Sequence, residues 1–213
     1  MIVEKRLTTY IHSLEKDQGP FFENLRKIAI NEDVPIIRRE TESFLKVILQ
    51  MSLAKKEDLK ILEIGTAIGY SALVMATEAP KANIDTIENY EKRLVSAREN
   101  IKGHDNINLI EGDAVQIIKE LDGPYDFIFL DAAKAQYIVM LPDLIRLMDK
   151  GAVLVADNVL QEGELIESRF VTERRQRTIH ERMREFLYEI KHNKDLESTI
   201  LTVGDGISVS IKK

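Results

Sequence analysis

The sequence contains no cysteine. This absence excludes disulfides, thiolate metal sites and a cysteine nucleophile. It also has no run that approaches the roughly 20 consecutive apolar residues of a membrane span, and the charged, amphipathic beginning of the chain has no apolar signal core. We therefore expect a soluble, cytoplasmic protein.

The chain also lacks an excess of basic residues. Lys and Arg together number 30 against 36 Asp and Glu, so the formal net charge is −6. Domains that bind nucleic acid in general are usually basic, so any such contact would have to come from a local patch. Hydrophobic residues make up 44% of the chain and charged residues 31%, which fits a globular protein with a substantial core and excludes disorder.

No repeat, low-complexity segment or Gly/Ser linker divides the 213 residues, so we predict a single domain over 1–213. Residues 1–55 are expected to form a helical N-terminal extension and cap. One of its helices is predicted to begin at Pro20, in the first turn, and another spans 40–53. Residues 56–213 are expected to form the core.

Short apolar runs alternate with longer amphipathic runs in the core, which indicates βαβ units and a parallel sheet covered on both faces. A helix is expected over 133–148, and a long charged helix over about 172–191. Two further strand-like segments follow, joined by Gly204-Asp205, and predict a hairpin and hence antiparallel pairing at the end of the sheet. The predicted strands are 60–64, 83–88, 107–111, 125–130, 152–156, 198–203 and 206–211.

The residues just beyond each strand matter most, because ligands of open α/β sheets bind at the carboxyl ends of the strands. The first strand leads into the glycine-rich stretch EIGTAIGYS at 63–71. Ala67 takes the place of the middle glycine of the dinucleotide fingerprint, which counts against a nicotinamide cofactor. Glu88 and Asp113 follow the next two strands. Each alone fits a plain turn or a helix N-cap, but together they predict an adenosine site.

Oxygen-bearing side chains follow the next two strands. Asp131 ends one, and Asp157 and Asn158 end the other. Such ligands suit a hard cation such as Mg²⁺, whereas helix caps and a turn asparagine are the alternative for either segment alone. Zinc is not expected, because the four histidines are dispersed and have the character of surface residues: His12, His104, His180 and His192.

Taken in order, EIGTAIGYS, TIENYEKR, EGDA, DFIFLDAAK and ADNVL resemble the metal-dependent O-methyltransferases of the catechol and caffeoyl-CoA type, from Val34 to the end. The resemblance implies a class I methyltransferase fold, an α/β Rossmann-like sheet of seven mostly parallel strands with one antiparallel strand, plus N-terminal helices. It implies S-adenosylmethionine (SAM) as the methyl donor. The implied donor-binding residues are Ile37, Glu63, Gly65, Ser71, Glu88, Asp113, Ala114 and Asp131.

The same resemblance implies Mg²⁺, or another divalent cation, held by Asp131, Asp157 and Asn158. It implies Lys134 as the catalytic base, acting beside Asp131. To take a proton, Lys134 would need a pKa that is depressed beside the metal. The alternative is a surface lysine or a purely electrostatic role.

A closer resemblance is to the bacterial tRNA methyltransferases that convert wobble 5-hydroxyuridine to 5-methoxyuridine. It rests on VPII, DAAKAQY, DNVLQEG, the ending VGDGISVSIKK and an arginine-rich segment over 169–184. Arginine forks suit phosphate, so Arg174, Arg175 and Arg177 are the expected contacts to a tRNA anticodon stem-loop. A solvated helix with Glu–Arg pairs is the alternative for this segment.

Three other functions stay open at this point. They are a small-molecule enzyme acting on a hydroxylated aromatic of the catechol or caffeoyl-CoA type, a non-catalytic SAM-binding module, and an NAD oxidoreductase. We also expect a homodimer, because the N-terminal helices carry more apolar surface than a lid requires.

Overall fold

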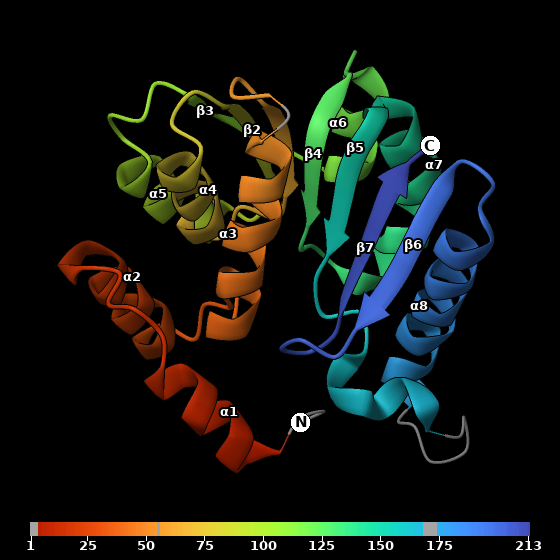
Figure 1. Ribbon diagram of the computed structural model, residues 1–213, viewed down its shortest axis with the longest axis horizontal. Coiled ribbons are helices and arrows are strands. Elements are labelled where there is room, and N and C mark those ends of the chain that lie inside the picture. Colours follow the sequence, from red (N-terminus) through yellow and green to blue (C-terminus); the bar gives the residue numbers. More distant parts are fainter. Residues whose placement is uncertain (1–3, 55, 168–173) are drawn as a thin grey trace.

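The structure, a computed structural model, describes residues 4–54, 56–167 and 174–213, without the side chains of 174 and 175. A seven-stranded sheet lies between two layers of helices (Figure 1), which confirms the expected fold. The strands are β1 (Lys60–Ile64), β2 (Asn83–Glu88), β3 (Ile107–Glu111), β4 (Tyr125–Leu130), β5 (Met148–Ala156), β6 (Leu196–Leu201) and β7 (Ile207–Lys212).

The strands are ordered β3-β2-β1-β4-β5-β7-β6. Only β7 runs against its neighbours, pairing antiparallel with both β5 and β6. The chain moves outward from β1 to β3 and then returns to β4, so the switch in direction lies between β1 and β4. Ile64 pairs with Leu130, and Leu130 with Ala156. Because these strands end level with one another, the segments that follow them share one rim, where open α/β sheets bind ligands.

Helices cover both faces of the sheet because its strands are apolar on both sides. Ile61 packs into the core beneath α3 and α4, whereas its neighbour Leu62 packs into the opposite core, beneath α7 and α8. Along the chain, α3 (Arg39–Leu53), α4 (Tyr70–Glu78) and α5 (Glu91–Asn100) lie on one face, and α6 (Ala114–Glu120), α7 (Tyr137–Leu147) and α8 (Arg174–His192) on the other (Figure 1).

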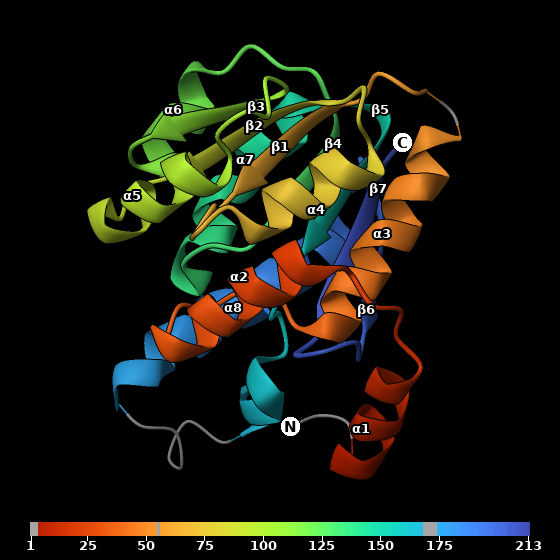
Figure 2. The same cartoon turned by 90° about the vertical axis from the view of Figure 1, so that its left-hand side faces the viewer.

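The N-terminal extension is helical, as expected. It consists of α1 (Lys5–Ser13) and α2 (Pro20–Asn31), followed by α3. Pro20 occupies the first turn of α2, where its missing N–H costs no hydrogen bond. Figure 2 shows α2 lying next to α4, with which it is in contact. Among the described residues, no helix combines the length and the apolar character needed to cross a bilayer.

Several details differ from the prediction. The helix expected over 133–148 is divided into a 3-10 turn, η1 (Lys134–Gln136), and α7, and a second 3-10 segment, η2 (Gln161–Ile166), follows β5. β5 begins at Met148 because Met148 pairs with Tyr125, although only its later residues are continuously apolar. The prediction that His180 lies on the surface is wrong, since it is 2% exposed, with Nε2 3.6 Å from a Glu164 carboxylate oxygen.

Candidate functional site

A cavity of about 630 Å³ opens beyond the carboxyl ends of the parallel strands. This size is typical of pockets that hold a small ligand or cofactor. The cavity collects nearly every residue for which the sequence predicts a donor or metal role. Its wall is built from segments that follow five strands and from the loop before α3: 35–38, 64–67, 87–90, 112–115, 131–134 and 157–158.

The glycine turn after β1 forms one wall of this cavity. Gly65 has a φ of +103°, and a Cβ added there would lie 1.9 Å from the carbonyl oxygen of Asp131. Only glycine therefore fits between the ends of β1 and β4. Ala67 also adopts a positive φ, of 48°, although alanine rarely does so. The turn is therefore tightly fixed where it faces the cavity.

Glu88 secures that turn from the end of β2. Its Oε2 accepts a hydrogen bond from the Ala67 N–H at 2.8 Å, and its Oε1 accepts from the N–H groups of Asn89 and Tyr90 at 3.0 and 2.9 Å. The carboxylate lines the cavity and retains acceptor capacity at Oε2, which has one donor. Glu88 is thus fixed by the main chain in an orientation compatible with its predicted ribose contact.

The third strand contributes Asp113 and Ala114, which both line the cavity. Asp113 also accepts a hydrogen bond from the Val115 N–H at 2.8 Å and is the N-cap of α6. Asp113 is therefore both a helix N-cap and a residue of the cavity wall. Ile37 and Ser71 line the cavity as well. The ligand contacts predicted for these residues stay predictions.

Glu63 lies elsewhere. It is fully buried and does not line the cavity. Its Oε2 accepts a hydrogen bond from Thr86 Oγ1 at 2.5 Å, and its Oε1 has no partner among the described residues. Burial raises the pKa of the Glu63 carboxyl to about 7, although hydrogen bonds from Ser71 and Thr86 lower it. Ser71, by contrast, lines the cavity.

The predicted metal residues meet on the rim formed by β4 and β5. The Asp131 N–H donates to the Ile64 carbonyl at 2.9 Å and the Asp157 N–H to the Leu130 carbonyl at 3.0 Å. Asp131, Asp157 and Asn158 all line the cavity. Burial, and then the negative charge of Asp131, raise the pKa of Asp157 to about 7.

These features fit a divalent cation. Two carboxylates and an amide are hard oxygen donors. Asp157 is buried beside a second carboxylate, Asp131, and a bound cation would stabilise both carboxylates in their charged form. Within the described part of the chain, no group of three or more His, Asp or Glu side chains could hold a metal. Metal binding by Asp131, Asp157 and Asn158, which are two carboxylates and an amide, stays a prediction.

Lys134 stands at the same rim. Its Nζ donates to Asp131 Oδ1 at 2.7 Å and to the Tyr137 hydroxyl at 3.0 Å. Burial alone lowers the pKa of the Lys134 ammonium, but Tyr137 and Asp131 together raise it above its ordinary value. The ammonium form of Lys134 is therefore favoured in this arrangement, and its role as catalytic base or as an electrostatic residue stays a prediction.

Sequence reasoning overlooked Tyr137, the residue that connects this rim. Its hydroxyl lies 3.0 Å from the Leu130 carbonyl oxygen and 3.1 Å from that of Asp157. It thus links Lys134 to the ends of both strands that carry the predicted metal ligands. The only signal in the sequence was its place in DAAKAQY, three residues after Lys134, where a 3-10 turn brings the two side chains together.

The arginine-rich segment is only partly described. Arg169 and the side chains of Arg174 and Arg175 lie outside the described residues, and Arg177 is half-buried on α8. Arg182 donates to the Ala135 carbonyl at 3.1 Å, and Arg184 to the Leu165 and Glu167 carbonyls at 2.6 and 2.9 Å. These two arginines hold η1 and η2 against α8, so part of the basic segment has a structural role.

Comparison with known proteins connects this geometry to a family. Residues 12–213 match the sequence model of the family described as O-methyltransferase. A catechol O-methyltransferase of Niastella koreensis is 34% identical over 132 residues. That alignment covers 58% of this chain and 58% of that enzyme, so it spans less than two thirds of the relative's length.

Solved structures extend the likeness over the whole fold. A candidate caffeoyl-CoA O-methyltransferase from Staphylococcus aureus superimposes with a TM-score of 0.87 at 30% identity, covering 96% of this chain and 98% of that one. An O-methyltransferase from Bacillus cereus in complex with SAH, the demethylated form of SAM, has a TM-score of 0.82 at 25% identity and covers 98% and 97%.

Proposed function

The chain belongs to the O-methyltransferase family, and from that membership we propose that it transfers the methyl group of SAM to a hydroxyl oxygen. The observation that supports the proposal is the composition of one cavity wall, in which the glycine turn, Glu88 and Asp113 lie beside the predicted metal ligands Asp131 and Asp157. A donor site and a site for a polarised hydroxyl would thus adjoin each other.

The chain would act mainly by alignment. The sulfonium of SAM is already a good methyl donor, so holding donor and acceptor in line removes most of the entropic cost of their meeting. Glu88 would accept hydrogen bonds from the ribose hydroxyls, and Asp113 and Ala114 would contact the adenine edge. Gly65 and Ser71 would hold the amino-acid part.

The acceptor must also lose its proton. A divalent cation, when bound, lowers the pKa of a coordinated hydroxyl and stabilises the resulting oxyanion. Asp131, Asp157 and Asn158 would hold such a cation. Lys134, kept charged by Asp131 and Tyr137, would add positive charge beside the oxyanion.

For the acceptor we favour a small hydroxylated aromatic of the catechol or caffeoyl-CoA kind. The activities for which the Niastella koreensis and Staphylococcus aureus proteins are named support this choice. The test is mass spectrometry of products after incubation with SAM, Mg²⁺ and either catechol or caffeoyl-CoA. A methylated product that disappears with EDTA and in Asp157→Asn is the expected result. SAM binding without methylation of any diol would refute the small-aromatic acceptor.

A second candidate acceptor is the wobble 5-hydroxyuridine of tRNA. It is supported by the packing of α8, which carries the arginine-rich segment, against η1 at the cavity rim. If tRNA is the acceptor, its binding should weaken steeply with salt and fall when Arg174, Arg175 and Arg177 become alanine. Nucleosides of cells that lack the protein should then lose 5-methoxyuridine and accumulate 5-hydroxyuridine. Unchanged nucleosides would eliminate this candidate.

A homodimer is the proposed assembly. Large apolar side chains are exposed on α1, on α2 and just after α1, among them Leu7, Tyr10, Leu14, Phe21 and Ile30. Such exposed apolar surface is typical of interfaces. Sedimentation should therefore give a species of twice the chain mass. A single species near 24.4 kDa would refute the dimer.

A further inference from the structure

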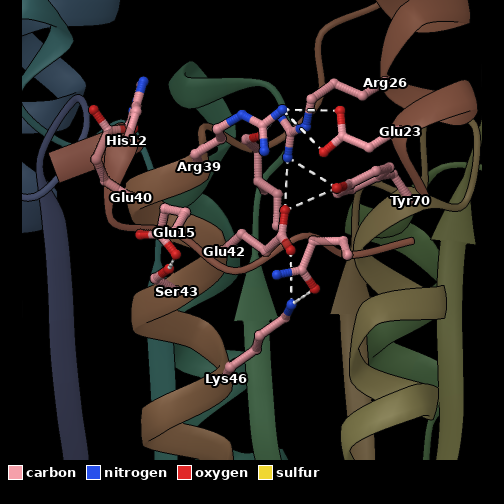
Figure 3. Close-up of polar contacts among 12 residues, drawn as sticks. His12, Glu15, Glu23, Arg26, Arg39, Glu40, Glu42, Ser43, Lys46 and Tyr70 are labelled. Carbon is pink, nitrogen blue, oxygen red and sulfur yellow. Dashed lines mark hydrogen bonds and ion pairs between the residues drawn. The ribbon is translucent and has the colours of Figure 1, made fainter. Parts of the chain in front are cut away.

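Behind the cavity wall, four side chains from three helices form a buried polar group, here named the Arg26 cluster. It consists of Arg26 on α2, Glu42 and Lys46 on α3, and Tyr70 at the beginning of α4 (Figure 3). Arg26, Glu42 and Tyr70 are 9%, 4% and 2% exposed. The cluster therefore connects the N-terminal extension to the helix that follows the glycine turn.

Its contacts are close and mutually supporting. Arg26 Nη2 donates to Glu42 Oε2 at 2.6 Å and to the Tyr70 hydroxyl at 2.9 Å, and that hydroxyl donates to the same Glu42 oxygen at 2.8 Å. Lys46 Nζ lies 2.8 Å from the other Glu42 oxygen. The guanidinium also lies over the Tyr70 ring, 4.8 Å from its centroid. Both oxygens of the buried carboxylate are thus satisfied.

The charges within the cluster balance. Burial alone raises the pKa of the Glu42 carboxyl, but hydrogen bonds from Lys46 and Tyr70 and the charges of Lys46 and Arg26 hold it below its usual value. Glu42 is therefore a carboxylate between two cations. Well-packed apolar side chains often stabilise a fold as much as such a buried ion pair does, so stability alone does not explain why charged residues stand here.

The position of Arg26 suggests an explanation. The second terminal nitrogen of the Arg26 guanidinium, Nη1, donates to the main-chain carbonyl of Ile37 at 3.3 Å. Ile37 and Tyr70 both line the cavity, Ile37 in the loop before α3 and Tyr70 directly after the glycine turn. One guanidinium thus holds two separate segments of the cavity wall at a fixed spacing.

We propose that Arg26 is a positioning residue for the methyl donor, acting through Ile37 and Tyr70 without lining the cavity itself. This inference rests on the proposed function, in which the cavity binds SAM. A planar fork can reach Ile37, Glu42 and Tyr70 at once. A lysine would keep the charge beside Glu42 but could not span all three groups.

The structure contains a matched control on the same two helices. Arg39 of α3 donates from Nη2 to both carboxylate oxygens of Glu23 on α2, each at 3.0 Å. Figure 3 shows this pair beside the Arg26 cluster. Neither Arg39 nor Glu23 lines the cavity. Arg39→Lys therefore weakens a tie between α2 and α3 without touching Ile37 or Tyr70.

The experiment compares Arg26→Lys with Arg39→Lys in the full chain. Titration calorimetry with SAM, well below the melting temperature, should give a Kd about tenfold higher for Arg26→Lys than for the unaltered protein, the effect of losing one charge-assisted hydrogen bond. Arg39→Lys should bind within about twofold of the unaltered protein. With an acceptor, Arg26→Lys should raise the KM for SAM and leave kcat nearly unchanged.

Equal Kd values for Arg26→Lys and Arg39→Lys would overturn the inference, because the cluster would then act only as a helix tie. If Arg26→Lys does not fold, Tyr70→Phe decides instead, since it removes only the hydroxyl that Arg26 and Glu42 share. About threefold weaker SAM binding supports the inference, and unchanged binding overturns it. Failure of the unaltered protein to bind SAM would refute the proposed function itself. That result can be distinguished from the two outcomes that concern Arg26, because both of them require SAM binding by the unaltered protein.

Discussion

Gly65 touches the main chain of Asp131 so closely that a Cβ would lie 1.9 Å from the Asp131 carbonyl oxygen. The turn expected to face the methyl donor and the strand end expected to carry the first metal ligand are therefore packed directly together. This contact makes the donor side and the metal side of the cavity parts of one rigid rim, on which alignment of donor and acceptor depends.

The contact predicts that Gly65→Ala is severely destabilising. An overpacked backbone contact adds to the cost of a positive φ, for a total of about 4 kcal/mol in the free energy of unfolding. Gly103→Ala is the control, because Gly103 has a φ of +87° but no atom within 4 Å of the place where an added Cβ would lie. It should cost only about 1 kcal/mol. Urea unfolding measures both, and equal losses would contradict the prediction.

Glu88→Gln should weaken SAM binding about tenfold or more. An amide nitrogen in place of one carboxylate oxygen would face a main-chain N–H, because both oxygens of Glu88 accept from main-chain donors. Glu91→Gln, in the exposed first turn of α5, provides the control and should bind SAM normally. Calorimetry compares the two, and similar affinities would argue against a contact between Glu88 and the donor.

Much of this site could be predicted from sequence because its residues follow strands. Apolar runs identify the strands, and parallel strands bring their carboxyl ends to one rim. Gly65, Glu88, Asp131 and Asp157 therefore share a cavity although up to 92 positions separate them. The antiparallel position of β7 followed from the hairpin in the same way.

The remaining features depend on tertiary packing. Arg26 has the sequence character of a surface arginine on an amphipathic helix, and its partner Tyr70 lies 44 positions away. His180 belongs to a highly charged helix, and its burial depends on how α8 meets η2. No local periodicity encodes such contacts, since each depends on how two distant elements meet.

Tyr137→Phe should weaken Mg²⁺ binding about tenfold, the lower end of what the loss of an outer hydrogen-bonding partner usually costs. The hydroxyl contacts Lys134 and the Asp157 carbonyl, so its removal loosens the rim without removing a ligand. Tyr125→Phe is the matched control, because its hydroxyl bonds Asp85 at 2.8 Å and Tyr125 does not line the cavity. Calorimetry with Mg²⁺ alone should give a lower affinity for Tyr137→Phe than for Tyr125→Phe. Equal Mg²⁺ affinities would exclude a role for Tyr137 in metal binding.

Glu63 should make the protein less stable as pH rises. Its pKa is about 7 in the folded protein against 4.5 for the ordinary carboxyl, so between these values the folded state binds more protons than the unfolded state. The free energy of unfolding then decreases with pH across this window. The full loss is on the order of 3 kcal/mol, is complete above pH 7 and is absent below about pH 4.5.

Glu63→Gln isolates this effect, because the amide is similar in shape and does not titrate. Asp157 also has a raised pKa, so part of the slope should persist in the variant. The stability of Glu63→Gln relative to the unaltered protein, measured by urea unfolding at pH 5, 6, 7 and 8, should therefore increase with pH. Stability curves that run parallel across this range would mean that Glu63 keeps an ordinary pKa despite its burial.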